Sequence, residues 1–299
     1  MNAIEINNLV KIYKTGTRAV KGVNLTVAKG DFFALLGANG AGKTTIISIL
    51  IGLVNKTSGS VKIFNYDIDR QFDQAKRIMG VVPQEFNFHM FEKVQDIVAT
   101  QAGFYGIDRV TALTNSEEVL KKVGLWEKRS SIARTLSGGL KRRLMIARAL
   151  VHKPEILILD EPTAGVDVQL RFGMWDYLRE LNAGGVTILL TTHYLEEVQQ
   201  MCRHAAILKE GEIVRLDSVK NLNKLIQQET YVITVRNMQP LDGIQSYAPV
   251  VIDEHTLEVN LNRDEQLNDL LIKLIQNGFA VTDVHPKEHR LERLFLSLL

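Results

Sequence analysis

The chain has 299 residues, of which 45% are hydrophobic and 23% are charged, a profile typical of a globular protein with one large domain or two. Its net charge of +2 shows no basic surplus that would indicate a nucleic-acid partner. The single cysteine, Cys202, excludes an internal disulfide, suits a reducing compartment and is expected to be a small buried hydrophobe. The sequence shows neither a signal-peptide pattern nor an apolar run of membrane-spanning length, so any role at a membrane is expected to act through a partner.

The first elements lead into a phosphate-binding pattern. Strands are predicted over residues 4–13 and 22–27, and Lys29-Gly30-Asp31 is expected to form a hairpin turn into an apolar strand at residues 32–36. An apolar, β-branched segment at residues 45–50 can form the first turns of a helix. Between that strand and that helix, the pattern G-x-x-x-x-G-K-[ST] is matched by Gly37-Ala38-Asn39-Gly40-Ala41-Gly42-Lys43-Thr44.

This octapeptide predicts a site for the phosphates of a nucleotide. Its glycines let several backbone N–H groups point at one anion, and the helix N-terminus adds its positive end. Lys43 supplies a point charge for the β- and γ-phosphates, and Thr44 supplies a hydroxyl for Mg²⁺. The alternative, a glycine-rich turn that binds nothing, is disfavoured by the motifs that follow.

The next segment combines a strand end with a helical region. A strand is predicted at residues 61–64, and a second apolar run from residue 78 is broken by Pro83, which places Gln84 at a strand end, where ligand groups of open α/β sheets collect. Residues 85–134 have a helical texture, with short helices around residues 97–99 and 117–123, and Thr114 with Glu117 could form a capping box. Four large apolar residues crowd behind Gln84 as core or as a docking patch for a partner: Phe86, Phe88, Met90 and Phe91.

Three further strand or helix ends carry polar groups. Ser137 is a good N-cap in the segment Leu136 to Leu140, and it opens a second helix N-terminus equipped for an anion. The apolar run at residues 156–159 predicts a buried parallel strand that ends in Asp160 and Glu161, of which one suits Mg²⁺ through water and the next suits orienting a water molecule. Another buried strand at residues 186–190 ends near His193. Residues 205–208 and 213–216 are expected to form a hairpin.

These motifs, in this order, resemble the ATP-binding subunit of ATP-binding cassette (ABC) transporters. The resemblance covers about the first 217 residues. It implies an α/β P-loop NTPase cassette over residues 1–217, with a mixed sheet and a helical subdomain at about residues 85–150. It also implies an enzyme that hydrolyses ATP to power transport, with ATP and Mg²⁺ as cofactors.

The resemblance also assigns roles to individual residues. Glu161 matches the general base, His193 the switch histidine, Gln84 the glutamine that senses the γ-phosphate site and faces the membrane subunit, and Lys43 the lysine that holds the phosphates. Mg²⁺ ligation is implied for Thr44, Gln84 and Asp160. Contacts with ATP are implied for Tyr13, which matches the aromatic that stacks on adenine, and for Gly37, Ala38, Asn39, Gly40, Ala41, Gly42, Lys43, Thr44, Thr45, Ser137, Gly138, Gly139 and Asp167.

The family geometry further implies partners and a location. Ser137, Gly138 and Gly139 would cover ATP from the opposite subunit of a nucleotide-sandwich dimer of two copies, and Asp167 would cross the dimer interface. An integral membrane permease is expected to hold the chain at the cytoplasmic face of the cell membrane. The family's commonest signature has Gln where Leu140 stands, and such variants resemble the exporter branch that handles drugs, lipids or polysaccharides.

Two other functions of cassette proteins are disfavoured by the sequence. Soluble cassette ATPases of translation carry two cassettes in one chain, and those of DNA repair insert long coiled coils between P-loop and signature, whereas this chain has one P-loop and a short interval. A non-catalytic regulatory cassette is disfavoured because Lys43, Asp160, Glu161 and His193 are all present.

Residues 218–299 predict a linker helix followed by a small α+β domain. The linker helix is expected over residues 218–228, with Ser218 as its N-cap, and strands at 231–235, 256–261 and 280–284. A helix with leucines from residue 267 to 274 is expected to close at Gly278, and an apolar stripe from Leu291 to Leu298 predicts a terminal helix. His285 and His289 are expected at the surface rather than on a metal. The region resembles the accessory domain that follows cassettes of the exporter branch.

Overall fold

A computed structural model describes residues 1–163, 168–224, 228–262 and 264–287 of the chain. The chain divides into two compact units, Met1–Ser218 and Val219–Leu299, which are described separately below. None of the helices in these described ranges is long and apolar enough to cross a membrane.

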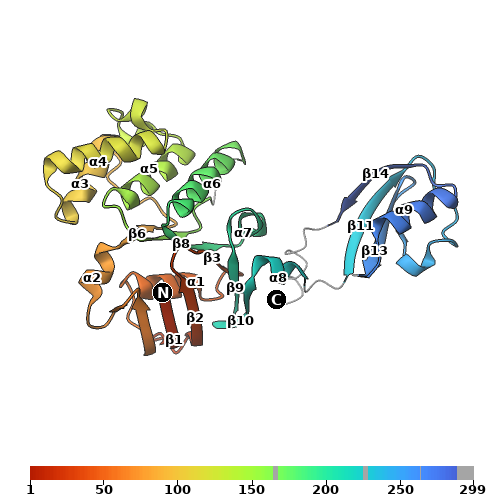
Figure 1. Cartoon of the computed structure of the whole chain (residues 1–299), viewed down its shortest axis with the longest axis horizontal. Coiled ribbons are helices and arrows are strands. Elements are labelled where there is room, and N and C mark those ends of the chain that lie inside the picture. Colours follow the sequence, from red (N-terminus) through yellow and green to blue (C-terminus); the bar gives the residue numbers. More distant parts are fainter. Residues whose placement is uncertain (164–167, 225–227, 263, 288–299) are drawn as a thin grey trace. The chain divides into compact units, whose positions relative to one another are not determined.

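The first unit is built on a six-stranded sheet whose buried strands place the functional residues (Figure 1). Strands β6 to β9 and β3 run parallel, whereas β10 is antiparallel to β9. Every residue of β3, β7 and β8 is buried, as expected for parallel strands that are covered on both faces. In sheet order, the strands are β10 (Glu212–Ser218), β9 (His204–Lys209), β3 (Phe32–Gly37), β8 (Thr187–Thr192), β7 (Ile156–Asp160) and β6 (Met79–Val82).

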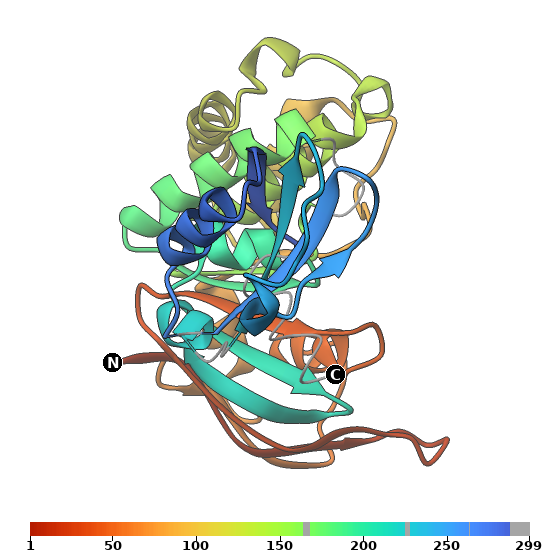
Figure 2. The ribbon, with the colours of Figure 1, turned by 90° about the vertical axis from the view of Figure 1, so that its right-hand side faces the viewer.

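A second sheet packs on the first with one helix in the shared core. It contains β2 (Arg18–Ala28), β1 (Asn2–Ile12), β4 (Ser58–Ile63) and β5 (Tyr66–Asp67), in that order. Figure 2 shows β1 and β2 as the long paired red strands at the bottom of the view. The core between the sheets includes side chains of β1, β2 and β4 from one sheet, of β3 and β6 to β9 from the other, and of helix α1 (Lys43–Leu50).

The expected hairpin at Lys29 to Asp31 is wrong. Although the chain turns there, β2 pairs with β1, whereas β3 pairs with β8 and β9 in the other sheet. The reason is the different burial of the two strands. Strand β2 alternates between buried and exposed residues and so covers a core with one face, while the fully buried β3 requires neighbours on both edges and cover on both faces.

The remaining helices of this unit gather largely on one side of the main sheet. Figure 1 shows α3 (Val94–Phe104), α4 (Arg109–Lys122) and α5 (Gly138–Leu150) together, beside α6 (Val168–Ala183). Two shorter helices, α2 (Phe72–Arg77) and α7 (Leu195–Met201), and the 3-10 turns η1 (Trp126–Lys128) and η2 (Ala133–Thr135) complete the set of described elements. The proposed capping box is wrong, because Asp108 caps α4 and Thr114 lies inside the helix, where its hydroxyl donates to the carbonyl of Val110.

The second unit is a small α+β fold. Its antiparallel sheet has the order β12 (Val250–Val251), β13 (Thr256–Asn262), β11 (Gln228–Val235) and β14 (Val281–Pro286), and it shares a core with α9 (Leu267–Gln276) and the 3-10 turn η3 (Gln245–Tyr247). A linker helix is present as α8 (Val219–Lys224), but the expected range of 218–228 is wrong at both ends, because Ser218 belongs to β10 and Gln228 belongs to β11. His285 is exposed as expected, whereas His289 and the predicted terminal helix lie outside the described residues.

Candidate functional site

The phosphate-binding loop joins β3 to α1 in the order predicted from the sequence. Gly42 stands at the N-cap of α1 with φ +109°, and a Cβ there would lie 2.6 Å from the carbonyl oxygen of Ala19. A Cβ at Gly37 would meet the carbonyl oxygen of Leu208 at the same distance of 2.6 Å. Because glycine has no side chain that could cap a helix, the first N–H groups of α1 depend on another acceptor, and an anion is suited to that role.

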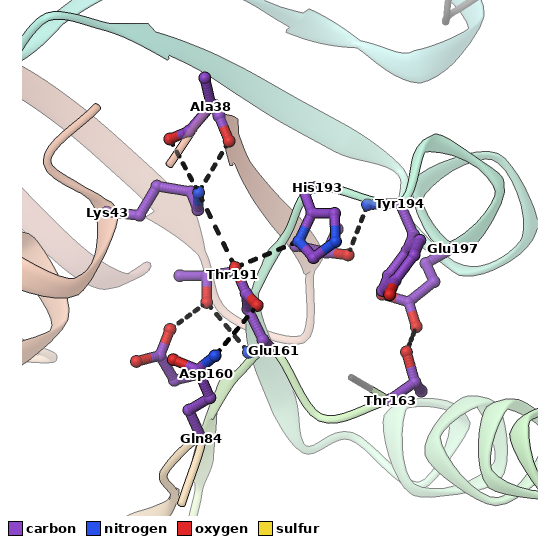
Figure 3. A network of polar contacts seen from close by, with 12 residues as sticks. Ala38, Lys43, Gln84, Asp160, Glu161, Thr163, Thr191, His193, Tyr194 and Glu197 are labelled. Atoms are coloured by element: carbon purple, nitrogen blue, oxygen red, sulfur yellow. Dashed lines mark hydrogen bonds and ion pairs between the residues drawn. The ribbon is translucent and has the colours of Figure 1, made fainter. Parts of the chain in front are cut away.

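Lys43 is buried beside this loop, with 5% of its surface exposed. Its ammonium donates to the carbonyl oxygens of Gly37 at 2.7 Å and Ala38 at 3.2 Å, and it lies 3.9 Å from Oε1 of Glu161 (Figure 3). Burial lowers the pKa of Lys43, although the nearby carboxylates of Glu161 and Asp160 oppose that shift. The ammonium therefore stands in a desolvated site where an added anion would interact strongly with it.

Glu161 is the point at which the predicted catalytic residues meet. Its Oε1 lies 3.2 Å from Nδ1 of His193, and its Oε2 accepts from Nε2 of Gln84 at 3.4 Å (Figure 3). The adjacent strands β8, β7 and β6 bring these residues together, because His193, Glu161 and Gln84 all follow the carboxyl ends of parallel neighbours. Glu161 has φ +47°, a backbone conformation that costs free energy in residues other than glycine and that recurs at functional sites.

Thr191 contacts both acidic residues, Asp160 through its carboxylate and Glu161 through its backbone, and was missed by the sequence analysis. Its hydroxyl donates a short hydrogen bond to Oδ1 of Asp160 and accepts from the backbone N–H of Glu161 at 3.2 Å. The register of β7 and β8 pairs Asp160 directly with Thr191, and this register was the missing information. Burial raises the pKa of Asp160, and the Thr191 hydroxyl opposes that rise.

A second buried network holds the backbone that follows Glu161. Glu197 of α7 is fully buried, and it accepts hydrogen bonds from the hydroxyl of Thr163 and, at 3.4 Å, from Nε1 of Trp175 in α6. Tyr194, which follows His193, is drawn beside this network in Figure 3. The hydrogen bond between Thr163 and Glu197 thus joins the segment that follows Glu161 to the segment that follows His193.

An open cleft of about 420 Å³ lies over these groups. Its lining includes Ala19, which the sequence analysis did not select, and the residues Asn39, Gly40, Gly42, Lys43, Thr44, Thr45, Gln84 and Glu161. Near Thr45, the Tyr13 hydroxyl lies 3.3 Å from the Thr45 hydroxyl, and the Tyr13 ring already faces the Lys11 ammonium at 4.9 Å. The cleft therefore brings most of the predicted phosphate and catalytic residues to one surface.

The signature segment is formed but does not line this cleft. Ser137 caps α5 as predicted, and its hydroxyl oxygen accepts from the backbone N–H of Leu140 at 3.4 Å. Ser137, Gly138 and Gly139 are not among the described residues that line the cleft. Asp167 lies outside the described residues.

The fold and the loop define a P-loop nucleotide-binding protein, and comparisons with known proteins narrow the class. A family model described as "ABC transporter" matches residues 20–164. The linearmycin resistance ATP-binding protein LnrL of Bacillus subtilis (strain 168) is 34% identical over 99% of this chain and 97% of its own length. The Nod factor export ATP-binding protein I of Paraburkholderia xenovorans (strain LB400) is 39% identical over 70% of this chain and 68% of its own length.

Solved structures agree with this family. The protein cbiO1 from Clostridium perfringens, part of the ABC transporter complex cbiONQ, has a TM-score of 0.69 with 29% identity over 74% of this chain and 90% of its own. A dimeric bacterial ABC transporter cassette has a TM-score of 0.66 with 29% identity over 72% of this chain and 98% of its own. The chain belongs to the ABC transporter family, as an ATP-binding subunit with ATPase activity.

Proposed function

We propose that ATP is hydrolysed in the cleft between the phosphate-binding loop and Glu161. The observation that carries this proposal is the convergence of Lys43, His193 and Gln84 on the Glu161 carboxylate. In the proposed reaction, Glu161 accepts the proton of the attacking water, and His193 orients the Glu161 carboxylate. Lys43 exchanges the loop carbonyls for phosphate oxygens, and Tyr13 stacks on adenine.

A Mg²⁺ ion fits the oxygen donors at this site, of which Thr44 and Gln84 line the cleft and Asp160 directly precedes the lining residue Glu161. We propose Thr44, Gln84 and Asp160 as the residues that hold it, through a hydroxyl, an amide oxygen and a carboxylate, which are the hard donors that Mg²⁺ prefers. Thr191 engages Oδ1 of Asp160, so the other carboxylate oxygen is available to the ion or to its water. Within the described residues, no group of three or more His, Cys, Asp or Glu side chains is placed to hold a metal ion by itself, and a site that adds phosphate oxygens to one carboxylate does not need one. When bound, the ion neutralises charge that develops on the phosphates.

The active form is proposed to be a dimer of two copies. Ser137, Gly138 and Gly139 form a helix N-terminus suited to an anion, yet the cleft of their own chain is lined by other described residues. Since a helix N-terminus acts only over its first turn, the signature segment must touch the nucleotide directly. Two copies related by a two-fold axis would meet this requirement, with Asp167 at the interface, and a similar cassette has been solved as a dimer.

The partner at the membrane is proposed to be an integral permease with export activity. Phe86 and Phe91 are 37% and 65% exposed, so they are not core residues, and aromatics at a surface suit a partner. The names of the similar proteins, a linearmycin resistance protein and a Nod factor export protein, support export. Residues 1–217 would be the cassette at the cytoplasmic face of the membrane, and residues 218–299 its accessory domain.

The substitution Glu161→Gln tests the proposed base and the dimer together. Loss of one preorganised electrostatic partner costs about 3 kcal/mol, so turnover is expected to fall roughly a hundredfold while ATP still binds. Sedimentation of this variant with ATP is expected to show a dimer, and without nucleotide a weaker association. Wild-type turnover would refute the role of Glu161, and a monomer under both conditions, with the permease present as well, would refute the two-chain site.

A further inference from the structure

One arginine of the signature helix α5 reaches across to the segment that carries Gln84. Arg142 is buried, with 3% of its surface exposed. Its Nη1 donates to the carbonyl oxygen of Pro83 and its Nη2 to the carbonyl oxygen of Gln84, each at 2.8 Å. The guanidinium thus holds two consecutive backbone carbonyls with its two terminal nitrogens.

The geometry of this contact fixes the backbone on both sides of Gln84. The proline ring restricts φ of Pro83, and the two carbonyl contacts restrict the rotations that remain at Pro83 and Gln84. These rotations decide where the Gln84 side chain points, and it points to Glu161, with Nε2 3.4 Å from Oε2. A planar guanidinium with donors in a fixed fork suits two fixed acceptors, whereas the point charge of a lysine does not.

The same helix holds the next residues of the segment. The Arg142 guanidinium lies 5.2 Å from the centre of the Phe86 ring. Six residues further along α5, Arg148 donates to the backbone carbonyl oxygen of Asn87 at 3.0 Å and to its Oδ1 at 2.8 Å. Four hydrogen bonds and one contact between a guanidinium and an aromatic ring therefore hold residues 83–87 against α5.

We propose that Arg142 is a positioning residue that makes Gln84, Phe86 and the signature helix move as one body. A displacement of the exposed Phe86 would then move Gln84 relative to Glu161 and Ser137 relative to its nucleotide in a single step. This inference rests on the proposed role of Gln84 in the reaction. Arg142 is then the side chain that transmits motion between Gln84, the signature helix α5 and the exposed Phe86.

The test combines backbone hydrogen exchange with ATPase kinetics on the full chain. Without nucleotide, Arg142→Met is expected to speed amide exchange in residues 84–88 at least tenfold and to leave β3 and the rest of α5 unchanged. With ATP and Mg²⁺, kcat of Arg142→Met is expected to fall about tenfold while KM for ATP changes little, because the phosphate-binding loop is untouched. Arg142→Lys is expected to lie between the wild type and Arg142→Met.

A double substitution separates positioning from general damage. If Arg142 acts through Gln84, then Gln84→Ala combined with Arg142→Met is expected to have the kcat of the slower single variant, not the product of both losses. Arg143→Met is the matched control. That arginine is its neighbour on α5, but its Nη1 faces the carbonyl oxygen of Val123 at 3.4 Å, so its effect should multiply with that of Gln84→Ala and leave exchange at 84–88 unchanged.

Three results would overturn the inference. These are unchanged exchange at residues 84–88 in Arg142→Met, multiplicative losses in the double variant, or equal behaviour of the Arg142 and Arg143 variants. If Arg142→Met does not fold, Arg142→Lys is judged by the same measurements. Wild-type turnover of Gln84→Ala would refute the proposed role of Gln84 itself, and exchange without nucleotide would still decide whether Arg142 holds the segment.

Discussion

Thr191→Val removes a hydroxyl from the buried centre of the site. Valine has nearly the same shape as threonine, and Thr191 is fully buried, so the substitution removes the hydroxyl with little change in packing. The N–H of Glu161 keeps an acceptor, because it also bonds to the backbone carbonyl oxygen of Thr191 at 3.1 Å. The hydroxyl also lies 3.5 Å from the carbonyl oxygen of Leu159, but its short hydrogen bond goes to Oδ1 of Asp160, so the loss falls mainly on Asp160.

The size and sign of the effect follow from that contact. A hydrogen bond to a charged group contributes about 1.5–3 kcal/mol, and one pKa unit corresponds to about 1.4 kcal/mol. Burial already raises the pKa of Asp160, and Asp160 is only 7% exposed, so water replaces the lost donor poorly. Its pKa is expected to rise further in the variant, so the carboxylate takes up a proton at a higher pH than in the wild type. Lys43, Glu161 and Arg142, which also act on Asp160, are unchanged in the variant.

The pH dependence of kcat/KM for ATP, measured between pH 5 and 9 at saturating Mg²⁺, checks this expectation. The acidic limb of Thr191→Val should move to higher pH than that of the wild type. Thr191→Ser keeps the hydroxyl and should follow the wild type. Superimposable profiles for the valine and serine variants would show that the hydroxyl does not control the charge of Asp160.

Two further expectations concern the ends of the machinery. Lys43→Ala should weaken ATP binding by roughly a hundredfold, as measured by calorimetry. The substitution removes the one ammonium group among the described residues that line the cleft. An unchanged affinity for ATP would contradict the role of Lys43. Changing Phe88 and Phe91 to serine should uncouple transport in vesicles that contain the permease and leave basal ATPase activity within about twofold. The reason is that the half-buried Phe88 and the exposed Phe91 contribute little to the core. If the variant fails to fold, both rings have a structural role instead.

Most of the candidate site residues could be predicted from the sequence because the patterns that mark them lie in contiguous residues. The eight residues from Gly37 to Thr44 form a loop that needs glycine at particular positions. In the structure, a Cβ atom at Gly37 or Gly42 would lie 2.6 Å from a backbone carbonyl oxygen. The ends of the apolar runs marked Gln84, Asp160, Glu161 and His193, since buried parallel strands carry their polar groups at the edge. The helix cap at Ser137 is likewise local.

The pairings between distant segments were decided only by the tertiary structure. Thr191 reaches Asp160 because β7 and β8 share one register, and Arg142 reaches Pro83 because α5 packs beside the end of β6. The wrong hairpin at Lys29 to Asp31 has the same origin, since neighbours in sequence separated into two sheets. Local patterns report the dihedral angles, caps and burial of single elements. The partner of a strand or of a buried side chain depends on how the whole core is filled, and no short stretch of sequence contains that information.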